Sequence, residues 1–391
     1  MLKNRLALGP LMASSTPSDE LDAMRHRARS PGDREVSKEL RESGAKTARE
    51  RIEGLLDEGS FVELDAFVKH RSGDHDLHLH APLGDGVVAG HGMIDGRRVA
   101  CFSQDYSVFS GTMGEMHAKK IVKVIELAEK SRLPIVGVWD GDGQRPHEGA
   151  TSLGSTGELL DRLVSCSGRI PIISIVLGTV SGTSALAAGV SDFVILGRDR
   201  GRMFMRSPYV IPEIIDGEVD EEGLGGASQH ASRSGVACLV AENENDSFDQ
   251  AAEILSYLPD HTLSDPPVIG SSEKWDRKCK GMEDLVPHDS DRPYDMRKVI
   301  EQVVDGKRFL ELFPTYAENV TIGFARLDGN TIGVVGNQPS VLAGCLDIDA
   351  SVKAARFIRT CDCFNIPVVT FVDVPGFLPG TVQEWGGIIR H

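Results

Sequence analysis

The chain has 391 residues, a formal net charge of −16 and 40% apolar residues, a composition typical of globular proteins that excludes disordered and fibrous classes. Its 58 acidic residues exceed its 42 basic ones, so the field of the protein repels polyanions and nucleic-acid binding is not expected. The seven cysteines show no paired CxxC spacing, which predicts reduced thiols in a cytoplasmic protein. No apolar run reaches about twenty residues, so no membrane span is predicted.

The first predicted elements are a strand over residues 98–103 and a helix over residues 115–130. The helix is predicted from one apolar face, with apolar side chains at i, i+3, i+4 and i+7: Ile121, Val124, Ile125 and Ala128. The segment LPIVGVWD, residues 133–140, is a continuous apolar run, which is typical of a strand buried on both faces of a sheet.

The pattern of helices and strands continues after this strand. GELLDRLVSC predicts a helix from Gly157, and IPIISIVLG predicts a second buried strand over residues 170–178. SGTSALAAG predicts a helix that begins near Thr183, and DFVIL predicts a strand from Asp192. Strand, helix and parallel strand in a right-handed crossover is the expected unit.

The sequence also contains an internal repeat. DGRRVACFSQD from Asp95 resembles DGNTIGVVGNQ from Asp328, a shift of 233 residues that also relates the following pairs: Gly90 and Gly323, Gly111 and Gly344, Lys120 and Lys353, Pro134 and Pro367, Asp140 and Asp373, Gly143 and Gly376. Upstream, RIEGLLDEGSFVEL resembles KVIEQVVDGKRFLEL at a different shift, so the first copy has an insertion near residues 71–83. By the 233-residue shift Ile170 would map to position 403, so the second copy is expected to be incomplete.

The insertion contains three histidines, His75, His78 and His80, which raise the hypothesis of a metal site. A solvated loop is the favoured interpretation, because no fixed ligand geometry is evident in this spacing.

Two glycine-rich turns follow buried strands, where helix N-termini can present free N–H groups to a ligand. In GTVSGTSALAAG, Gly182 would let the backbone approach a bound group, which is how backbone donors form an oxyanion hole. The alternative is that small residues there only allow helix and strand to pack. In WDGDGQRPHEG, Asp140 and Asp142 are either paired acids or, more commonly, turn-forming residues. No GxSxG, P-loop or GxGxxG motif is present.

Several long motifs together resemble one family: TARERIEGLLDEGSFVELDAFVKHR from Thr47, GDGVVAGHGMIDGR, FSQDYSVFSGTMGE, LGGASQH, PYDMRKVIE, NQPSVLAGCLDIDASVKAARFIRTCD and FVDVPGFLPG. Over about residues 20–391 the chain is similar to the carboxyltransferase β subunit of biotin-dependent acyl-CoA carboxylases, of the propionyl-CoA carboxylase type. The resemblance implies an α/β fold with tandem crotonase-like (ββα superhelix) domains, the second of them incomplete. The expected division is a disordered extension (1–20), an acyl-CoA-binding domain (21–265), a linker (266–293) and a partial biotin-facing domain (294–391).

The chemistry that the resemblance implies is carboxyl transfer. Carboxybiotin on a partner carrier protein gives up its carboxyl group, the ureido nitrogen removes the proton α to the thioester, and backbone donors stabilise the negative oxygens. Implied partners are acyl-CoA, a biotin carboxylase or biotin carboxyl carrier subunit and further copies of the chain, usually six, with no bound metal. Implied site residues are Gly182 and Thr183 for catalysis; Gly141, Gly143, Arg145, Gly149, Ser152 and Ser207 for acyl-CoA; and Asn337, Gln338, Pro339, Pro375, Gly376 and Phe377 for biotin.

Three departures from the family fall on the turns expected to hold the acyl thioester. GPCAGG in the family is GTVSGT here, so that Thr183 replaces a glycine; DSGGAR is DGDGQR, and ITGP is MRSP. The second oxyanion loop of the family, FGGA, would lie beyond His391. Two alternatives therefore stay open, a biotin-dependent acyl-CoA decarboxylase subunit and a non-catalytic, truncated paralogue with a role in assembly.

Overall fold

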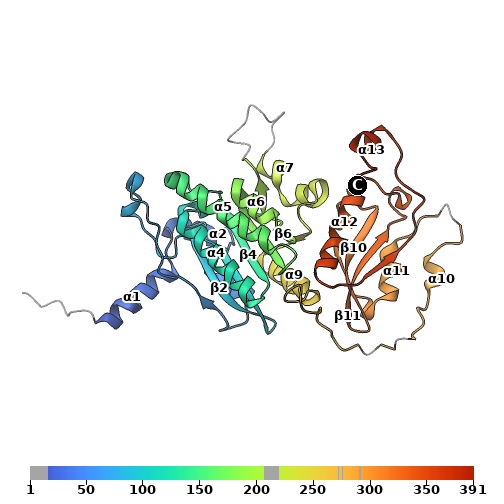
Figure 1. Cartoon of the computed structure of the whole chain (residues 1–391), viewed down its shortest axis with the longest axis horizontal. Coiled ribbons are helices and arrows are strands. Elements are labelled where there is room, and N and C mark those ends of the chain that lie inside the picture. Colours follow the sequence, from blue (N-terminus) through green and yellow to red (C-terminus); the bar gives the residue numbers. More distant parts are fainter. Residues whose placement is uncertain (1–15, 207–219, 272, 275, 290–291) are drawn as a thin grey trace, which may run out of the picture.

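A computed structural model of the chain describes residues 16–206, 220–271, 273–274, 276–289 and 292–391. These residues form two bodies that lie side by side, each built on its own β-sheet (Figure 1). The larger sheet has eight strands in the order β1-β2-β3-β4-β5-β6-β8, with β7 paired to β5, and the smaller has the order β12-β11-β10-β9. The predicted α/β fold class is confirmed.

The first body alternates strands with helices that cover the faces of its sheet (Figure 1). Its strands are β1 (Val62–Glu63), β2 (Val87–Ile94), β3 (Arg97–Gln104), β4 (Ile135–Gly141), β5 (Ile172–Ser181), β6 (Phe193–Gly197), β7 (Arg202–Phe204) and β8 (Leu239–Ala241). Its α-helices are α1 (Pro17–Arg29), α2 (Arg34–Glu42), α3 (Ala48–Leu55), α4 (Glu115–Ser131), α5 (Gly149–Cys166), α6 (Gly182–Gly189), α7 (Glu221–Gly225), α8 (Ala227–Gln229) and α9 (Glu244–Tyr257). Strands β3 to β6 are parallel, and β4 is buried along its whole length, as its continuous apolar sequence predicts.

The second body repeats the start of this arrangement. Its strands are β9 (Phe309–Leu312), β10 (Val320–Leu327), β11 (Asn330–Asn337) and β12 (Val368–Phe371), and its helices are α11 (Met296–Val303), α12 (Ile348–Cys363) and α13 (Thr381–Gly386). As in the first body, an antiparallel hairpin is followed by a helix and a parallel strand. The segment that joins the bodies runs along the outside of the second one and contains α10 (Met282–Leu285) (Figure 1).

The structure confirms the internal repeat element by element. A shift of 233 residues carries the bounds of β2 onto those of β10 and those of β3 onto those of β11. A shift of 248 carries α3 onto α11, and the two helices are capped at equivalent positions by Thr47 and Asp295. The insertion that separates the two shifts contains a short 3₁₀ helix, Asp74–Leu79.

Two buried lysines occupy equivalent positions in the two copies. The Nζ of Lys120 donates hydrogen bonds to the carbonyls of Gly84 and Val87, at 3.0 and 2.6 Å. The Nζ of Lys353 donates to the equivalent carbonyls of Ala317 and Val320 and to two more. Burial lowers the pKa of each lysine to about 8. Each lysine therefore ties its helix to the loop before the hairpin, which is a structural role.

Two element boundaries differ from the prediction by three residues or more. Helix α5 begins at Gly149 and not at Gly157, although the Gly-, Ser- and Thr-rich segment between them has low helix propensity. Burial of Ser152 and its hydrogen bond to the carbonyl of Met113 compensate for that low propensity. Strand β5 continues beyond residue 178 to Ser181, because its last three residues pair with β7, which is a tertiary contact.

The two bodies share part of one hydrophobic core. Phe193 of the first body packs against Phe324 of the second at 6.0 Å between ring centroids, and both belong to the same buried cluster. The guanidinium of Arg356 on α12 donates a hydrogen bond of 3.0 Å to the carbonyl of Ser191. The second body is therefore packed onto the first. The domain boundaries at residues 265 and 293 remain predictions.

Next to this contact, Asp192 is expected to make stability depend on pH. Burial raises the pKa of Asp192 from 3.8 to about 6, although its carboxylate accepts a hydrogen bond from the N–H of Ile172. The folded protein then binds more protons than the unfolded chain in this interval, so the free energy of unfolding falls as pH rises from about 4 to about 6.

Asp192→Asn removes this titration while keeping an oxygen acceptor for Ile172. Wild type should therefore lose about 1–3 kcal/mol relative to the variant across that interval and show no further relative change above pH 7. Urea unfolding of both proteins at several pH values measures the difference. A difference that is independent of pH would contradict the assignment.

Candidate carboxyltransferase site

The two glycine-rich turns of the first body meet in space. A Cβ atom placed on Gly143, in the turn after β4, would lie 3.1 Å from the carbonyl oxygen of Ser181 and 3.7 Å from the nitrogen of Thr183. Gly182 begins α6 with a φ of +55°, a left-handed conformation that glycine adopts without strain. The predicted catalytic residues Gly182 and Thr183 thus lie against the predicted acyl-CoA residue Gly143.

The N-terminus of α6 leaves polar groups free for a ligand. Ser181 stands at the N-cap but makes no side-chain hydrogen bond to the helix, and the first N–H groups of any helix lack partners inside it. Within the described part of the chain, Thr183 Oγ1 and Ser184 Oγ are buried without a hydrogen-bond partner. This helix end can therefore stabilise a negatively charged oxygen.

The turn after β4 is held by main-chain contacts. The N–H of Met113 donates to the carbonyl of Gly143 at 2.7 Å, and the N–H of Arg145 donates to the carbonyl of Met113 at 2.8 Å. Gly141 faces Gly111 so closely that a Cβ on Gly141 would lie 2.2 Å from the Gly111 carbonyl. These contacts between main-chain groups fix the backbone of the turn.

The side chains of Arg145 and Ser152, which were predicted to bind acyl-CoA, face the interior of the protein. Arg145 is fully buried and pairs with Asp85 and Glu148, each at 2.7 Å, and Ser152 is bonded to the Met113 carbonyl. Burial of both residues leaves no surface for a ligand, so in this structure they support the turn instead of contacting acyl-CoA. Gly149 begins α5, and a Cβ atom added there would have no atom within 4 Å, while Ser207 lies outside the described residues.

The two aspartates of this turn have different environments and are not a symmetrical acid pair. Asp140 is buried, and its carboxylate pairs with Arg51 at 2.7 Å; Arg51 also pairs with Glu244 at 2.8 Å. Burial lowers the pKa of Arg51, but the two carboxylates outweigh it and the net pKa is raised. Asp142 contacts Ser181 beside the α6 N-terminus, and burial, followed by Glu221, raises the pKa of Asp142.

The turn after β12 in the second body is built in the same way. The N–H of Leu346 donates to the carbonyl of Gly376 at 3.1 Å, as Met113 does to Gly143. The side chain of Asn337 accepts from the N–H of Asp373 at 3.3 Å and donates to the carbonyl of Gly344, as Gln104 does with the equivalent groups in the first body. The side chain of Asn337 therefore holds the turn.

A cavity of about 700 Å³ lies beside this turn. It is lined by Val286, Pro287, His288, Asp289, Arg292, Pro293, Tyr294, Pro339, Ser340, Ala343, Asp373, Val374 and Pro375. Two residues predicted to bind biotin, Pro339 and Pro375, are in this lining, whereas Gln338 is buried beneath it and bonded to the N–H of Met296. Gly376 accepts the turn hydrogen bond, and the Phe377 side chain is 64% exposed.

Sequence reasoning did not select Tyr294 or Asp373 as site residues, although both line the cavity. The repeat could have identified Asp373, because it is the counterpart of Asp140. Tyr294 lies in the PYDMRKVIE motif, at the end of the segment between the bodies, but nothing in that motif indicates a contact with a ligand.

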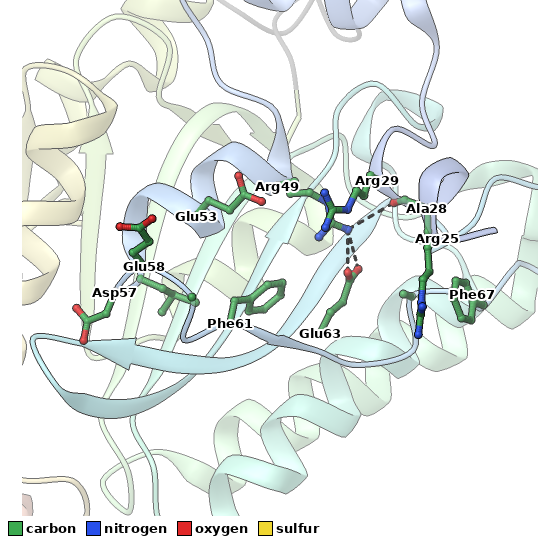
Figure 2. A pocket seen from close by; sticks show the side chains of 13 residues that line it. Arg25, Ala28, Arg29, Arg49, Glu53, Asp57, Glu58, Phe61, Glu63 and Phe67 are labelled. Carbon is green, nitrogen blue, oxygen red and sulfur yellow. Dashed lines mark hydrogen bonds and ion pairs between the residues drawn. The ribbon is translucent and has the colours of Figure 1, made fainter. Parts of the chain in front are cut away.

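Another cavity, of about 690 Å³, lies between α1, α3 and the edge strand β1 and contains no predicted site residue. Figure 2 shows Arg49 pairing with Glu63 in it, with Arg25 and Arg29 at one end and acidic residues at the other. Its lining mixes both signs of charge, so it favours no ligand class.

The histidine-rich insertion does not assemble a metal centre within the described ranges. His70 Nε2 is hydrogen-bonded to the His80 carbonyl at 2.9 Å, and the ring of His75 contacts that of His147. Across those ranges, no group of three or more His, Cys, Asp or Glu side chains is placed to hold a metal ion.

Comparison with known proteins shows the family to which the chain belongs. Residues 39–391 match the carboxyl transferase domain. The chain belongs to the carboxyl transferase family. Its relatives include the biotin-dependent acetyl-/propionyl-coenzyme A carboxylase beta5 subunit of Mycobacterium tuberculosis, 47% identical over 379 residues, which are 95% of this chain and 69% of that protein.

Two further comparisons support membership of the carboxyl transferase family. The methylmalonyl-CoA decarboxylase subunit alpha of Veillonella parvula is 46% identical over 360 residues, covering 92% of this chain and 70% of the relative. The crystal structure of transcarboxylase 12S with methylmalonyl-coenzyme A and methylmalonic acid bound superimposes with a TM-score of 0.94 at 38% identity, over 97% of this chain and 74% of that one. The predicted family and fold are thus confirmed. Among the described residues, no helix has the length and apolar character needed to span a membrane.

Proposed function

We propose that this carboxyl transferase transfers a carboxyl group from carboxybiotin, presented by a carrier subunit, to the α-carbon of a short acyl-CoA such as propionyl-CoA or acetyl-CoA. The observation that carries the proposal is the contact of the Gly143 turn with the N-terminus of α6 at Gly182 and Thr183. The Mycobacterium tuberculosis relative, named as an acetyl-/propionyl-coenzyme A carboxylase subunit, supports this class of substrate.

The chain itself would stabilise charge and orient the acyl group. Removal of the α proton places negative charge on the thioester oxygen, and the free N–H groups of Gly182 and Thr183 are the donors available to it. Thr183 keeps its N–H despite replacing the family glycine, and its hydroxyl is buried without a hydrogen-bond partner among the described residues. No side-chain nucleophile is needed, which agrees with the lack of a GxSxG motif in the sequence.

The cavity of the second body fits biotin. Four prolines and two valines in its lining suit an apolar bicyclic ring, and the polar side chains beside them, among them Tyr294 and Asp373, could meet a urea. When bound there, carboxybiotin supplies the carboxyl group and a nitrogen base. Pro339 and Pro375 would contact the ring, while Asn337 and Gln338 hold the surrounding turns.

The same proposal includes partners. A biotin carboxylase and a biotin carboxyl carrier subunit would deliver the cofactor, and copies of the chain would assemble, with six as the expected number. A second crystal structure of transcarboxylase 12S, with a TM-score of 0.93 to this chain, is that of a hexamer assembly with substrate binding to a multienzyme core, which supports both parts.

The test is reconstitution with a biotin carboxylase, a biotinylated carrier, ATP and labelled bicarbonate. We expect label to enter propionyl-CoA or acetyl-CoA only when all components are present. Assembly is measured in parallel by sedimentation. Failure to label any short acyl-CoA, with a carrier shown to be carboxylated, would refute the proposal.

A second candidate activity, acyl-CoA decarboxylation with transfer of the carboxyl group to biotin, is favoured by the Veillonella parvula relative. The same turns would serve both directions, because each passes through the same charged thioester oxygen. Incubation with methylmalonyl-CoA and biotinylated carrier, without ATP, separates them. Release of propionyl-CoA that outpaces the forward reaction would favour the decarboxylase.

A further inference from the structure

The cavity of the second body contains a hydrogen bond that has no counterpart in the first. The phenol of Tyr294 donates to Asp373 Oδ2 at 2.6 Å. Asp373 follows β12 by two residues, its counterpart Asp140 lies near the end of β4, and the backbone N–H of each donates to an equivalent side-chain amide oxygen. The two aspartates therefore share a backbone position and differ in what surrounds the carboxylate.

The carboxylate of Asp140 forms an ion pair inside the protein, whereas that of Asp373 forms no ion pair with a described residue. Asp140 is buried against the cation of Arg51, which neutralises its charge. The residue of α11 that corresponds to Arg51 by the 248-residue shift is Val299, which cannot pair with a carboxylate. Asp373 is exposed, its Oδ2 accepts from the neutral phenol of Tyr294, and no described residue donates to its Oδ1.

Tyr294 is suited to hold this carboxylate in one orientation. Burial, followed by its hydrogen bond and charge interaction with Asp373, raises the pKa of Tyr294 well above its ordinary value. The phenol therefore stays protonated and remains a donor at every pH near neutrality. With Oδ2 engaged, Oδ1 is the acceptor left for a group that enters the cavity.

The other residues that line the cavity indicate the shape and charge of a group that could bind beside Asp373. Pro287, Pro293, Pro339 and Pro375 form rigid apolar walls, and Arg292 adds a positive charge. A small rigid bicycle with one N–H donor for Asp373 and a carboxylate for Arg292 matches these features. N-carboxylated biotin has both, since its second ureido nitrogen keeps its hydrogen.

We infer that Asp373 binds biotin by accepting a hydrogen bond from the ureido N–H that is not carboxylated, and that Tyr294 is a positioning residue that orients Asp373. The inference rests on the proposed function, because it assigns residues to the same cavity. It adds a side-chain hydrogen-bond acceptor to a cavity in which prolines form the apolar walls and Arg292 supplies a positive charge. Only ligands with an intact ureido N–H should bind more tightly because of the hydrogen bond to Asp373.

Binding of biocytin, the lysine conjugate of biotin, to the full chain tests the inference without requiring turnover. In Asp373→Asn the amide can still accept from Tyr294 but presents N–H where Oδ1 stood, so the Kd for biocytin should rise about tenfold, or about 1.4 kcal/mol. Tyr294→Phe should raise it severalfold by freeing the carboxylate. Asp362→Asn, which removes an equal charge from α12 outside the lining, is the matched control and should leave Kd unchanged.

Titration of propionyl-CoA with the same variants separates the inference from the proposed function. We expect its Kd to be unchanged in all three variants, since the acyl-CoA turns lie in the first body, and thermal midpoints to match wild type. Equal biocytin affinity in wild type, Asp373→Asn and Tyr294→Phe, or no biocytin binding by a wild type that binds propionyl-CoA, would overturn the inference and leave acyl-CoA recognition intact. Binding of neither ligand would overturn both.

Discussion

Gly182→Ala is expected to lower the rate of carboxyl transfer by about 10²–10³-fold while leaving the protein folded. The φ of Gly182 is +55°, and alanine held there would cost about 1–2 kcal/mol. The strain would be relieved by rotation of the backbone, which redirects the N–H groups at the start of α6. The effect is conformational and not steric, because the nearest atom to an added Cβ, the Met205 carbonyl oxygen, is 3.9 Å away.

The same helix supplies a matched control. Gly189 ends α6, no atom lies within 4 Å of an added Cβ there, and its φ is not in the left-handed region. Gly189→Ala should therefore keep full activity with equal or higher thermal stability. Initial rates of labelled carboxyl transfer compare the two variants. If Gly182→Ala retains wild-type kcat, the α6 N-terminus does not stabilise the thioester oxygen.

Arg51→Met should lower the free energy of unfolding by about 3–5 kcal/mol, the largest stability effect that we expect from a single substitution. The guanidinium is 1% exposed and pairs with Asp140 at 2.7 Å and with Glu244 at 2.8 Å. Methionine fills a similar volume but leaves the buried Asp140 carboxylate without a cation. Guanidinium chloride unfolding followed by circular dichroism measures the loss.

An exposed arginine in the same part of the chain provides the control for Arg51. Arg41 pairs with Glu50 at 3.4 Å, with 60% of the arginine side chain exposed, so Arg41→Met should cost less than about 1 kcal/mol. The double variant Arg51→Met with Asp140→Asn should recover part of the loss, since no uncompensated charge at 140 remains. Equal losses from Arg41→Met and Arg51→Met would show that burial does not govern these ion pairs.

Much of the fold follows from local patterns. The helix predicted over residues 115–130 is α4, and the continuous apolar runs are β4 and β5, because the hydrophobic pattern that indicates each element lies within its own segment. The start of α5 and the last residues of β5 were not predicted. Both depend on partners distant in sequence, namely Met113 for Ser152 and β7 for β5.

The candidate site was predicted in part. The prediction that Gly143, Gly182 and Thr183 share one site required only the rule that turns after parallel strands meet at one edge of a sheet. Motif position alone could not reveal which side chains of the Gly143 turn face outward. Arg145 stands in a glycine-rich turn, where exposure is the default expectation, yet Asp85 and Glu148 draw it into the interior.

By itself, the sequence determined the internal repeat, the α/β class and the family, since each is recorded in the spacing and identity of residues along the chain. Only the tertiary structure decided what each repeated residue does. Lys120 and Lys353 are equivalent in sequence and in role, whereas Asp140 and Asp373 are equivalent only in sequence. The reason is physical, because the role of a carboxylate depends on its burial and on the charge beside it. An arginine from α3 forms an ion pair with one aspartate, whereas the neutral phenol of a tyrosine holds the other at the edge of a cavity.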